Sequence, residues 1–210
     1  MDLKQFYFLF VIILIFLPGC LKEQKEYIEE KQIIEEKPME VVDMAKALFI
    51  VAPNNFKDEE YFTPKEVLEE NSIKVVTCSL KPEAVSINGK KVKADVLLDK
   101  ATSDYDAIVF IGGAGASIYF DNTKAHNLAK EFYKKGKIVA AICIAPVTLA
   151  NAGVLEGKRA TVWNGDYVSK LEDKGATYTG EDVTVDGNII TANGPGAAEE
   201  FGNAIVEKLQ

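Results

Sequence analysis

The sequence contains little histidine and cysteine, and this scarcity excludes several kinds of site. The chain of 210 residues has one histidine and three cysteines, at positions 20, 78 and 143. No Cys-x-x-Cys pair occurs, and the three cysteines are too few and too far apart for a zinc cage or a disulfide framework. We therefore expect no bound metal, and each cysteine has to be interpreted on its own.

An excess of positive charge is also missing. The chain has 24 Lys and Arg against 32 Asp and Glu, which gives a net charge of -8. Binding to a phosphate backbone requires clustered Lys and Arg, so nucleic acid is not an expected partner. With 48% hydrophobic and 27% charged residues, the composition is that of a globular protein with one sizeable core.

The longest hydrophobic run is too short to cross a bilayer. Twelve apolar or aromatic residues, Phe6 to Leu17, would cover about 18 Å as a helix, against roughly 30 Å of hydrocarbon. Such a run is typical of a signal peptide. The following Leu17-Pro18-Gly19-Cys20 resembles the bacterial lipobox, which implies cleavage of a signal peptide over 1–19 and a lipid on Cys20. The expected location is the cell envelope, outside the cytoplasm; an uncleaved anchor with an incidental cysteine is the alternative.

The segment 20–44 has the composition of a tether. Residues 21–44 include four lysines and eight acidic residues, with no glycine and no sustained apolar stripe. Such a segment cannot bury enough surface to offset the entropy lost on ordering. We expect a charged tether followed by one folded domain over 45–210, although a first helix packed on the domain is an alternative.

From residue 45 onward, short apolar runs alternate with helical patterns. We expect buried strands over 47–52, 73–78, 107–111 and 137–142. We expect one helix to begin at Thr63, because Thr63 and Glu66 form a capping box around Pro64. We expect three further helices, over 122–135, from Pro146 onward and over 197–209. Asn88-Gly89 and Asp186-Gly187 predict hairpins at the periphery of the sheet. The alternation predicts an α/β fold, with a doubly wound, mainly parallel, flavodoxin-like sheet between helices.

The end of the fourth strand is the first candidate site. Sites in open α/β sheets form where strands end, and Cys143 lies between a strand and the helix that begins at Pro146. Helix N–H groups there favour a thiolate, and the amides of Ile144 and the Gly112-Gly113 turn could hold an oxyanion. The glycine-rich stretch lacks the spacing of nucleotide-binding loops, so we expect no cofactor.

The stretch Ala140-Ala-Ile-Cys-Ile-Ala-Pro146 resembles the elbow of the ThiJ/PfpI superfamily. Gly112-Gly113, the segment 56–64, the segment 187–196 and the closing 204–209 extend the resemblance over nearly the whole domain. It implies a class I glutamine amidotransferase-like fold, and it implies a homodimer. It also implies that Cys143 is the nucleophile, that Glu60 is its partner carboxylate, and that Gly113 and Ile144 supply the amides of an anion pocket.

Two departures from the family pattern concern histidine. Ile144 stands where the protease-like branch has a histidine, and Trp163 covers the place of the histidine in the other branch. The single His126 falls in the helix before the elbow strand, where we expect an ordinary helix residue. Because a thiol nucleophile in hydrolysis normally needs a base, these departures argue against efficient peptidase activity.

The leading hypothesis is that Cys143 reacts with or senses small electrophiles such as reactive carbonyls or peroxide, with Glu60 tuning the thiol. The alternatives are a cysteine peptidase or glyoxalase-like hydrolase acting on a peptide or small substrate, and a non-enzymatic envelope-binding module. Taken without the resemblance, Cys143 could be an inert core thiol and Glu60 part of a solvated acidic loop. Cys78, within an apolar strand, is expected in the core.

Overall fold

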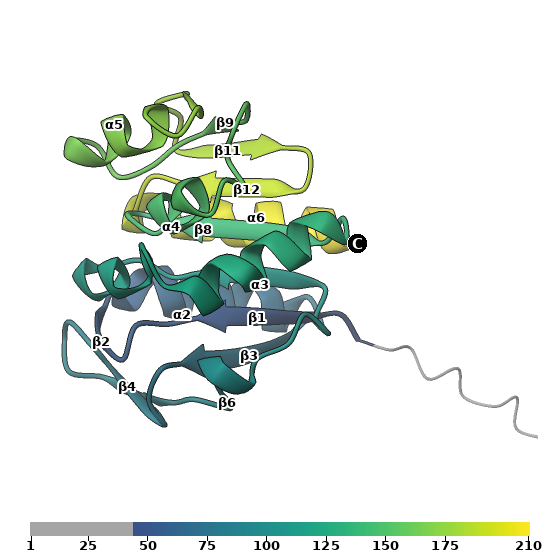
Figure 1. Ribbon diagram of the computed structural model, residues 1–210. Helices are drawn as coiled ribbons and strands as arrows, with labels where there is room; N and C mark the ends of the chain where they lie inside the picture. Colours follow the sequence, from purple (N-terminus) through teal and green to yellow (C-terminus); the bar gives the residue numbers. More distant parts are fainter. Residues whose placement is uncertain (1–43) are drawn as a thin grey trace, which may run out of the picture. The chain divides into compact units, whose positions relative to one another are not determined.

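The computed structural model describes residues 44–210, which contain a central seven-stranded sheet (Figure 1). The strand order is β11-β12-β8-β7-β1-β3-β6, and every neighbouring pair is parallel except β11 and β12. The strands span Lys46–Ile50 (β1), Lys74–Ser79 (β3), Val96–Leu97 (β6), Ala107–Phe110 (β7), Ile138–Ile142 (β8), Val183–Asp186 (β11) and Ile189–Ala192 (β12). The predicted α/β fold with a mainly parallel sheet is confirmed.

Helices cover both faces of this sheet (Figure 1). On one face α2 packs against α6, and on the other α3 and α4 lie across β8, with α5 against α4. The α-helices span Asp58–Glu70 (α2), Thr123–Lys134 (α3), Pro146–Asn151 (α4), Asp166–Glu172 (α5) and Ala198–Leu209 (α6). Short 3-10 helices span Leu98–Lys100 (η1), Ala114–Tyr119 (η2) and Pro195–Ala197 (η3).

The central strands are apolar because both of their faces are covered. All residues of β1 after Lys46, and all residues of β7 and β8, are buried. This explains why these segments are continuous hydrophobic runs and do not alternate with polar residues. Asn122 caps α3, accepting a hydrogen bond of 2.9 Å from the Ala125 N–H. The core therefore fixes β7 and β8 side by side, with their carboxyl ends at one edge of the sheet.

The predicted start of the first helix is wrong. The helix α2 begins at Asp58, and Thr63, Pro64 and Glu66 lie in its interior. Three acidic residues, Asp58 to Glu60, fill its first turn, where the positive end of the helix dipole favours them. The Asp58 carboxylate is buried and accepts hydrogen bonds from Ser86 Oγ at 2.9 Å and Asn88 Nδ2 at 3.0 Å. These long-range bonds fix the helix start five residues before the local capping signal.

The two predicted hairpins form, but only the first is peripheral. The strands β4 (Glu83–Ser86) and β5 (Lys91–Lys93) join β2 (Asn54–Phe56) in a separate three-stranded sheet. In the second hairpin, β11 is the outer strand, whereas β12 pairs with β8 inside the main sheet and is entirely buried. The expectation that the second hairpin is peripheral is therefore wrong for β12. The helix α5 and the small parallel pair of β9 (Arg159–Ala160) and β10 (Thr177–Tyr178) were not expected.

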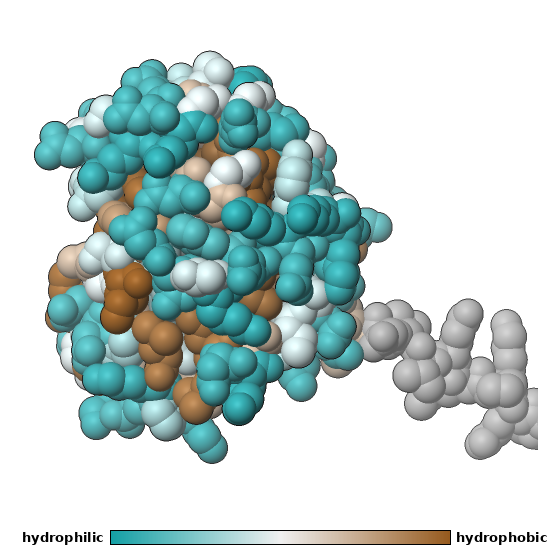
Figure 2. Space-filling model, viewed as in Figure 1, coloured by the Kyte–Doolittle hydropathy of each residue, from teal (hydrophilic) through white to brown (hydrophobic). Residues whose placement is uncertain are grey.

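The surface of the domain is mainly hydrophilic on the face shown in Figure 2, with hydrophobic side chains showing mostly in the region of β2, β4 and β6. Within residues 44–210 no helix combines the length and the apolar character needed to span a membrane. The signal peptide, Cys20 and all but the last residue of the predicted tether lie outside the described residues. They remain predictions.

The role of Asp58 can be tested by Asp58→Ala. The substitution leaves the Ser86 hydroxyl and the Asn88 amide without their buried acceptor, so the free energy of unfolding should fall by about 1–3 kcal/mol. Urea denaturation measures this loss. Glu59→Ala, in the same helical turn but with a half-exposed side chain, is the matched control and should change stability by less than about 0.5 kcal/mol. Equal effects of the two substitutions would contradict the role assigned to Asp58.

Candidate functional site

The backbone at Cys143 makes a sharp turn between β8 and α4. Cys143 has φ of 63°, a left-handed conformation that is costly for a residue with a side chain. Two hydrogen bonds hold it there: its N–H donates to the Ala192 carbonyl at 2.9 Å, and its carbonyl accepts from the Trp163 N–H at 2.8 Å. The chain then enters α4 with Pro146 in the first turn. The strand-to-helix turn therefore lies where the sequence predicts it.

Gly112 allows a carboxylate and the cysteine to approach the same backbone position. A Cβ atom at Gly112 would lie 2.3 Å from Glu60 Oε2 and 2.5 Å from Cys143 Cβ, which real contacts do not allow. At Gly113, with φ of 90°, a Cβ atom would lie 2.5 Å from the Lys57 backbone nitrogen. The two glycines therefore let the end of β7, the start of α2 and the cysteine turn close on one another.

Glu60 is completely buried beside the cysteine, although it lies in the first turn of a helix rich in charge. Its pKa is raised to about 7, mainly by burial and in part by the charge of Glu59, although the Cys143 side chain, Lys57 and the Gly112 amide lower it. The Cys143 thiol is thus close enough to act on the carboxyl group. Yet neither carboxylate oxygen has a partner with regular hydrogen-bond geometry. Glu60 is a buried acid whose neighbours, the Cys143 thiol and the Gly112 amide, act on it without regular hydrogen-bond geometry.

The Cys143 side chain lies in an environment with opposing effects on its charge. Burial raises its pKa to about 12, and the charge of Glu60 adds to the rise, whereas the amides of Gly113 and Ile144 lower it. The residue is 8% exposed, so its surroundings are mostly protein. The structure therefore brings together Cys143, Glu60, Gly113 and Ile144, the four residues that the sequence singled out. Their chemical roles remain predictions.

The thiol and the carboxyl group titrate as a pair. When Glu60 is ionised, its charge opposes a thiolate at Cys143; when Glu60 is protonated, this repulsion disappears and the acid can donate a hydrogen bond to the sulfur. The singly charged pair therefore has two forms, thiol with carboxylate and thiolate with carboxylic acid. With a pKa of about 12 for Cys143 against about 7 for Glu60, the first form predominates. The amides of Gly113 and Ile144 shift the balance towards the second form, because they stabilise negative charge on the sulfur.

The remaining candidates take the places that the sequence suggested. His126 lies on α3, with Nε2 2.7 Å from the Phe120 carbonyl oxygen. Cys78 is a free thiol in the core of β3, as expected. The backbone N–H of Trp163 donates a hydrogen bond to the Cys143 carbonyl, so Trp163 lies next to the elbow. Among residues 44–210, no group of three or more His, Cys, Asp or Glu side chains could hold a metal ion.

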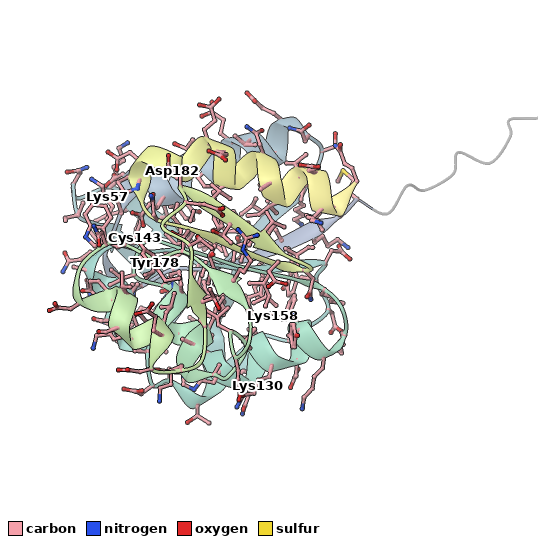
Figure 3. The ribbon with its side chains drawn as sticks, turned by 90° about the horizontal axis from the view of Figure 1, so that it is seen from above. Lys57, Lys130, Cys143, Lys158, Tyr178 and Asp182 are labelled. Atoms are coloured by element: carbon pink, nitrogen blue, oxygen red, sulfur yellow. The ribbon has the colours of Figure 1, made fainter. Side chains whose placement is uncertain are left out.

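Lys57 is the residue near the site that sequence reasoning missed. Its charge lowers the pKa of Glu60, and its Nζ lies 3.2 Å from Glu59 Oε2. Figure 3 shows Lys57 and Cys143 at the same end of the domain, with Lys130 and Lys158 away from it. The available signal was its position directly before three acidic residues. That signal is hard to read without knowing that α2 begins at Asp58.

The fold and this site together define an α/β protein with a cysteine on a sharp strand-to-helix turn and a buried carboxyl group beside it. The chain belongs to the DJ-1/PfpI family, whose sequence profile matches residues 45–208. An uncharacterized protein of Methanocaldococcus jannaschii is 44% identical over 170 residues, covering 79% of this chain and 83% of that protein.

Solved structures are similar as well. The ThiJ/PfpI domain protein of Brachyspira murdochii has a TM-score of 0.76 and 36% identity, covering 78% of this chain and 95% of that one. An oxidized DJ-1 of Toxoplasma gondii has a TM-score of 0.71 and 28% identity, covering 79% of this chain and 90% of that one. The family resemblance found in the sequence is thereby confirmed.

Burial of Glu60 predicts a specific dependence of stability on pH. Its pKa rises from 4.5 to about 7 on folding, so the folded state binds the proton more tightly between these values. The stability of the fold should therefore fall by the order of 3 kcal/mol as the pH rises from 4.5 through 7. Glu60→Gln, which stays neutral, should remove most of this fall.

Urea denaturation on both sides of this pH window measures the effect. The control is Glu59→Gln, the same chemical change at a neighbouring, half-exposed side chain whose pKa is lowered mainly by a backbone hydrogen bond. This control should keep the fall in stability shown by the wild type. If wild type and Glu60→Gln depend on pH in the same way, the assignment of a proton to buried Glu60 is wrong.

Proposed function

We propose that Cys143 attacks, or is oxidised by, small electrophiles such as reactive carbonyls and peroxide, and that the protein protects against the stress they cause. The observation that carries this proposal is the pairing of the cysteine with Glu60, a buried acid without a regular hydrogen-bond partner. A carboxyl group that can hold the thiol proton allows a thiolate to form without a histidine.

The proposed steps use the residues around the sulfur. With a carbonyl compound, the thiolate adds to the carbonyl carbon, a C–S bond forms, and the electron pair of the C=O bond moves to oxygen, which takes the proton from Glu60. With peroxide, the thiolate attacks one oxygen, the O–O bond breaks, and the products are a sulfenic acid and water once the leaving oxygen is protonated. The amides of Gly113 and Ile144 stabilise negative charge at the start of either reaction.

Three facts favour small electrophiles over peptides. Cys143 is only 8% exposed, so the sulfur offers little surface to a polypeptide chain. Its sequence neighbour is the buried Ile144, and by the family resemblance Trp163 stands in the place of the other histidine. The similar Toxoplasma gondii DJ-1 has been solved as an oxidized protein. A peptidase or glyoxalase-like hydrolase, and a non-enzymatic binding module, remain the alternatives that the experiment must separate.

The test is the pH dependence of the modification rate of Cys143 by iodoacetamide and by peroxide, followed by mass spectrometry. In the wild type we expect the rate to rise near pH 7 and then level off. Loss of one proton from the pair at about pH 7 creates a thiolate fraction, and that fraction then stays constant. In Glu60→Gln the step near pH 7 should disappear, and the rate should keep rising by about tenfold per pH unit.

The buried Cys78, whose pKa burial also raises to about 12, serves as an internal control in the same chain. It should react far more slowly than Cys143. A Cys143 that reacts no faster than Cys78, or a wild-type profile without a step near pH 7, would overturn the proposal. If the protein cleaves peptides and Cys143→Ser abolishes this turnover, the hydrolase is favoured. If Cys143→Ala leaves the binding of a partner unchanged, the binding module is favoured.

We also propose that the protein is an envelope lipoprotein anchored through a lipid on Cys20. The tether over 20–44 would connect this anchor to the folded domain, which we expect to form a homodimer. Expressed in a bacterium that processes lipoproteins, the wild type should partition into detergent and begin with an acylated Cys20. Cys20→Ser should stay in the aqueous phase, while the control Cys143→Ser behaves as wild type. A Cys20→Ser protein that still enters the detergent would favour the uncleaved anchor.

A further inference from the structure

Trp163 lies at the elbow and is half exposed, with 47% of its surface accessible. Its backbone position is fixed by the cysteine itself, because its N–H donates to the Cys143 carbonyl at 2.8 Å. It is also the only tryptophan in the sequence. Packing in the core does not account for a ring that is half exposed beside Cys143, so we consider what this ring could bind.

One side of the ring is held by a glycine. A Cβ atom at Gly194 would lie 2.6 Å from Trp163 Cε3 and 2.7 Å from Cζ3, so only glycine lets the ring lie this close to the backbone. Gly194 follows β12, the strand whose Ala192 carbonyl accepts the Cys143 N–H. The ring therefore packs against the segment that follows β12, and its backbone is bonded to the cysteine turn.

Trp163 lines a hollow of about 230 Å³ next to the elbow. Val162 and Trp163 supply most of its apolar surface, and the remaining lining residues are Asn164, Tyr178, Gly180 and Asn193. Polar surface slightly exceeds apolar surface in this hollow, so the tryptophan ring is its main apolar contact for a ligand. The volume lies below the roughly 300–1,000 Å³ of sites for drug-sized ligands, so the occupant has to be small. Figure 3 shows Tyr178 at the same end of the domain as Cys143.

We propose that Trp163 is a specificity-determining residue, and that its bare face holds the flat aromatic group of the electrophile that Cys143 attacks. This inference rests on the proposed function and narrows its substrate class to electrophiles carrying an aromatic ring. The physical reason is that stacking on a fixed ring gains energy without ordering a flexible side chain. A small aliphatic electrophile cannot use this surface.

Two alkylating probes with the same reactive group test the proposal. Iodoacetanilide and iodoacetamide both transfer their CH2 carbon to Cys143: a C–S bond forms, the C–I bond breaks, iodide leaves, and Glu60 takes the thiol proton. The measured quantity is the ratio of the two rate constants at Cys143, aromatic over aliphatic. We expect this ratio to fall by about threefold to tenfold in Trp163→Ala. Trp163→Phe should keep most of it, because a flat ring remains.

Met44→Ala is the matched control. It removes a half-exposed apolar side chain just before β1, at the edge of the sheet opposite the elbow, and should leave the ratio unchanged. A ratio that stays within twofold of the wild type in Trp163→Ala would overturn the inference, even if Cys143 proves highly reactive. The inference is also overturned if Trp163→Phe lowers the ratio of rate constants as much as Trp163→Ala does.

A second measurement needs no reaction and separates this inference from the proposed function. In Cys143→Ala the fluorescence of the single tryptophan should change saturably with acetanilide and not with acetamide. This result would support the aromatic subsite even if Cys143 turned out to be unreactive. Equal or absent responses to the two compounds would overturn it.

Discussion

The close approach of three chain segments at Gly112 is the constraint on which the site depends. Glu60 from α2 and Cys143 from the end of β8 both approach a backbone position where no Cβ atom fits. This approach requires α2 to begin at Asp58, and the hydrogen bonds of Asp58 to Ser86 and Asn88 secure that start. The small three-stranded sheet thus helps to determine where the carboxyl group of the site lies.

The electrostatic character of the site follows from this packing. Burial without regular hydrogen bonds is unfavourable for an ionised carboxylate, and the pKa of Glu60 rises to about 7 as a result. Burial also raises the pKa of Cys143, but the amides of Gly113 and Ile144 act on the sulfur alone. The burial of two acids side by side therefore gives a coupled pair in which the carboxyl group, with its pKa near 7, loses its proton first.

The sequence predicts this structure well wherever local pattern decides. The apolar runs of β1, β7 and β8, the helix α3 and the cysteine turn before Pro146 all lie where expected. The failures come from contacts distant in sequence. The capping box at Thr63 does not begin the helix, because the hydrogen bonds of Asp58 place the helix start at Asp58. The hairpin at Gly187 contributes an inner strand of the main sheet, because β12 pairs with β8. Lys57 and the hollow beside Trp163 depend on the same kind of contact. For Lys57 the local signal, its position before three acidic residues, is informative only once the start of α2 is known.

The absence of histidine near the sulfur limits the chemistry that this arrangement supports. A histidine can take a proton in one step and return it in the next, because it changes charge near neutral pH while exposed to substrate. Glu60 also titrates near neutral pH, but it is completely buried and its one close reacting neighbour is Cys143. Such an acid can hold the proton of the thiol, and it is poorly placed to protonate the leaving group of a bulky peptide. The proposed reactions, addition to a carbonyl and oxidation by peroxide, fit this limitation because both need only a local proton.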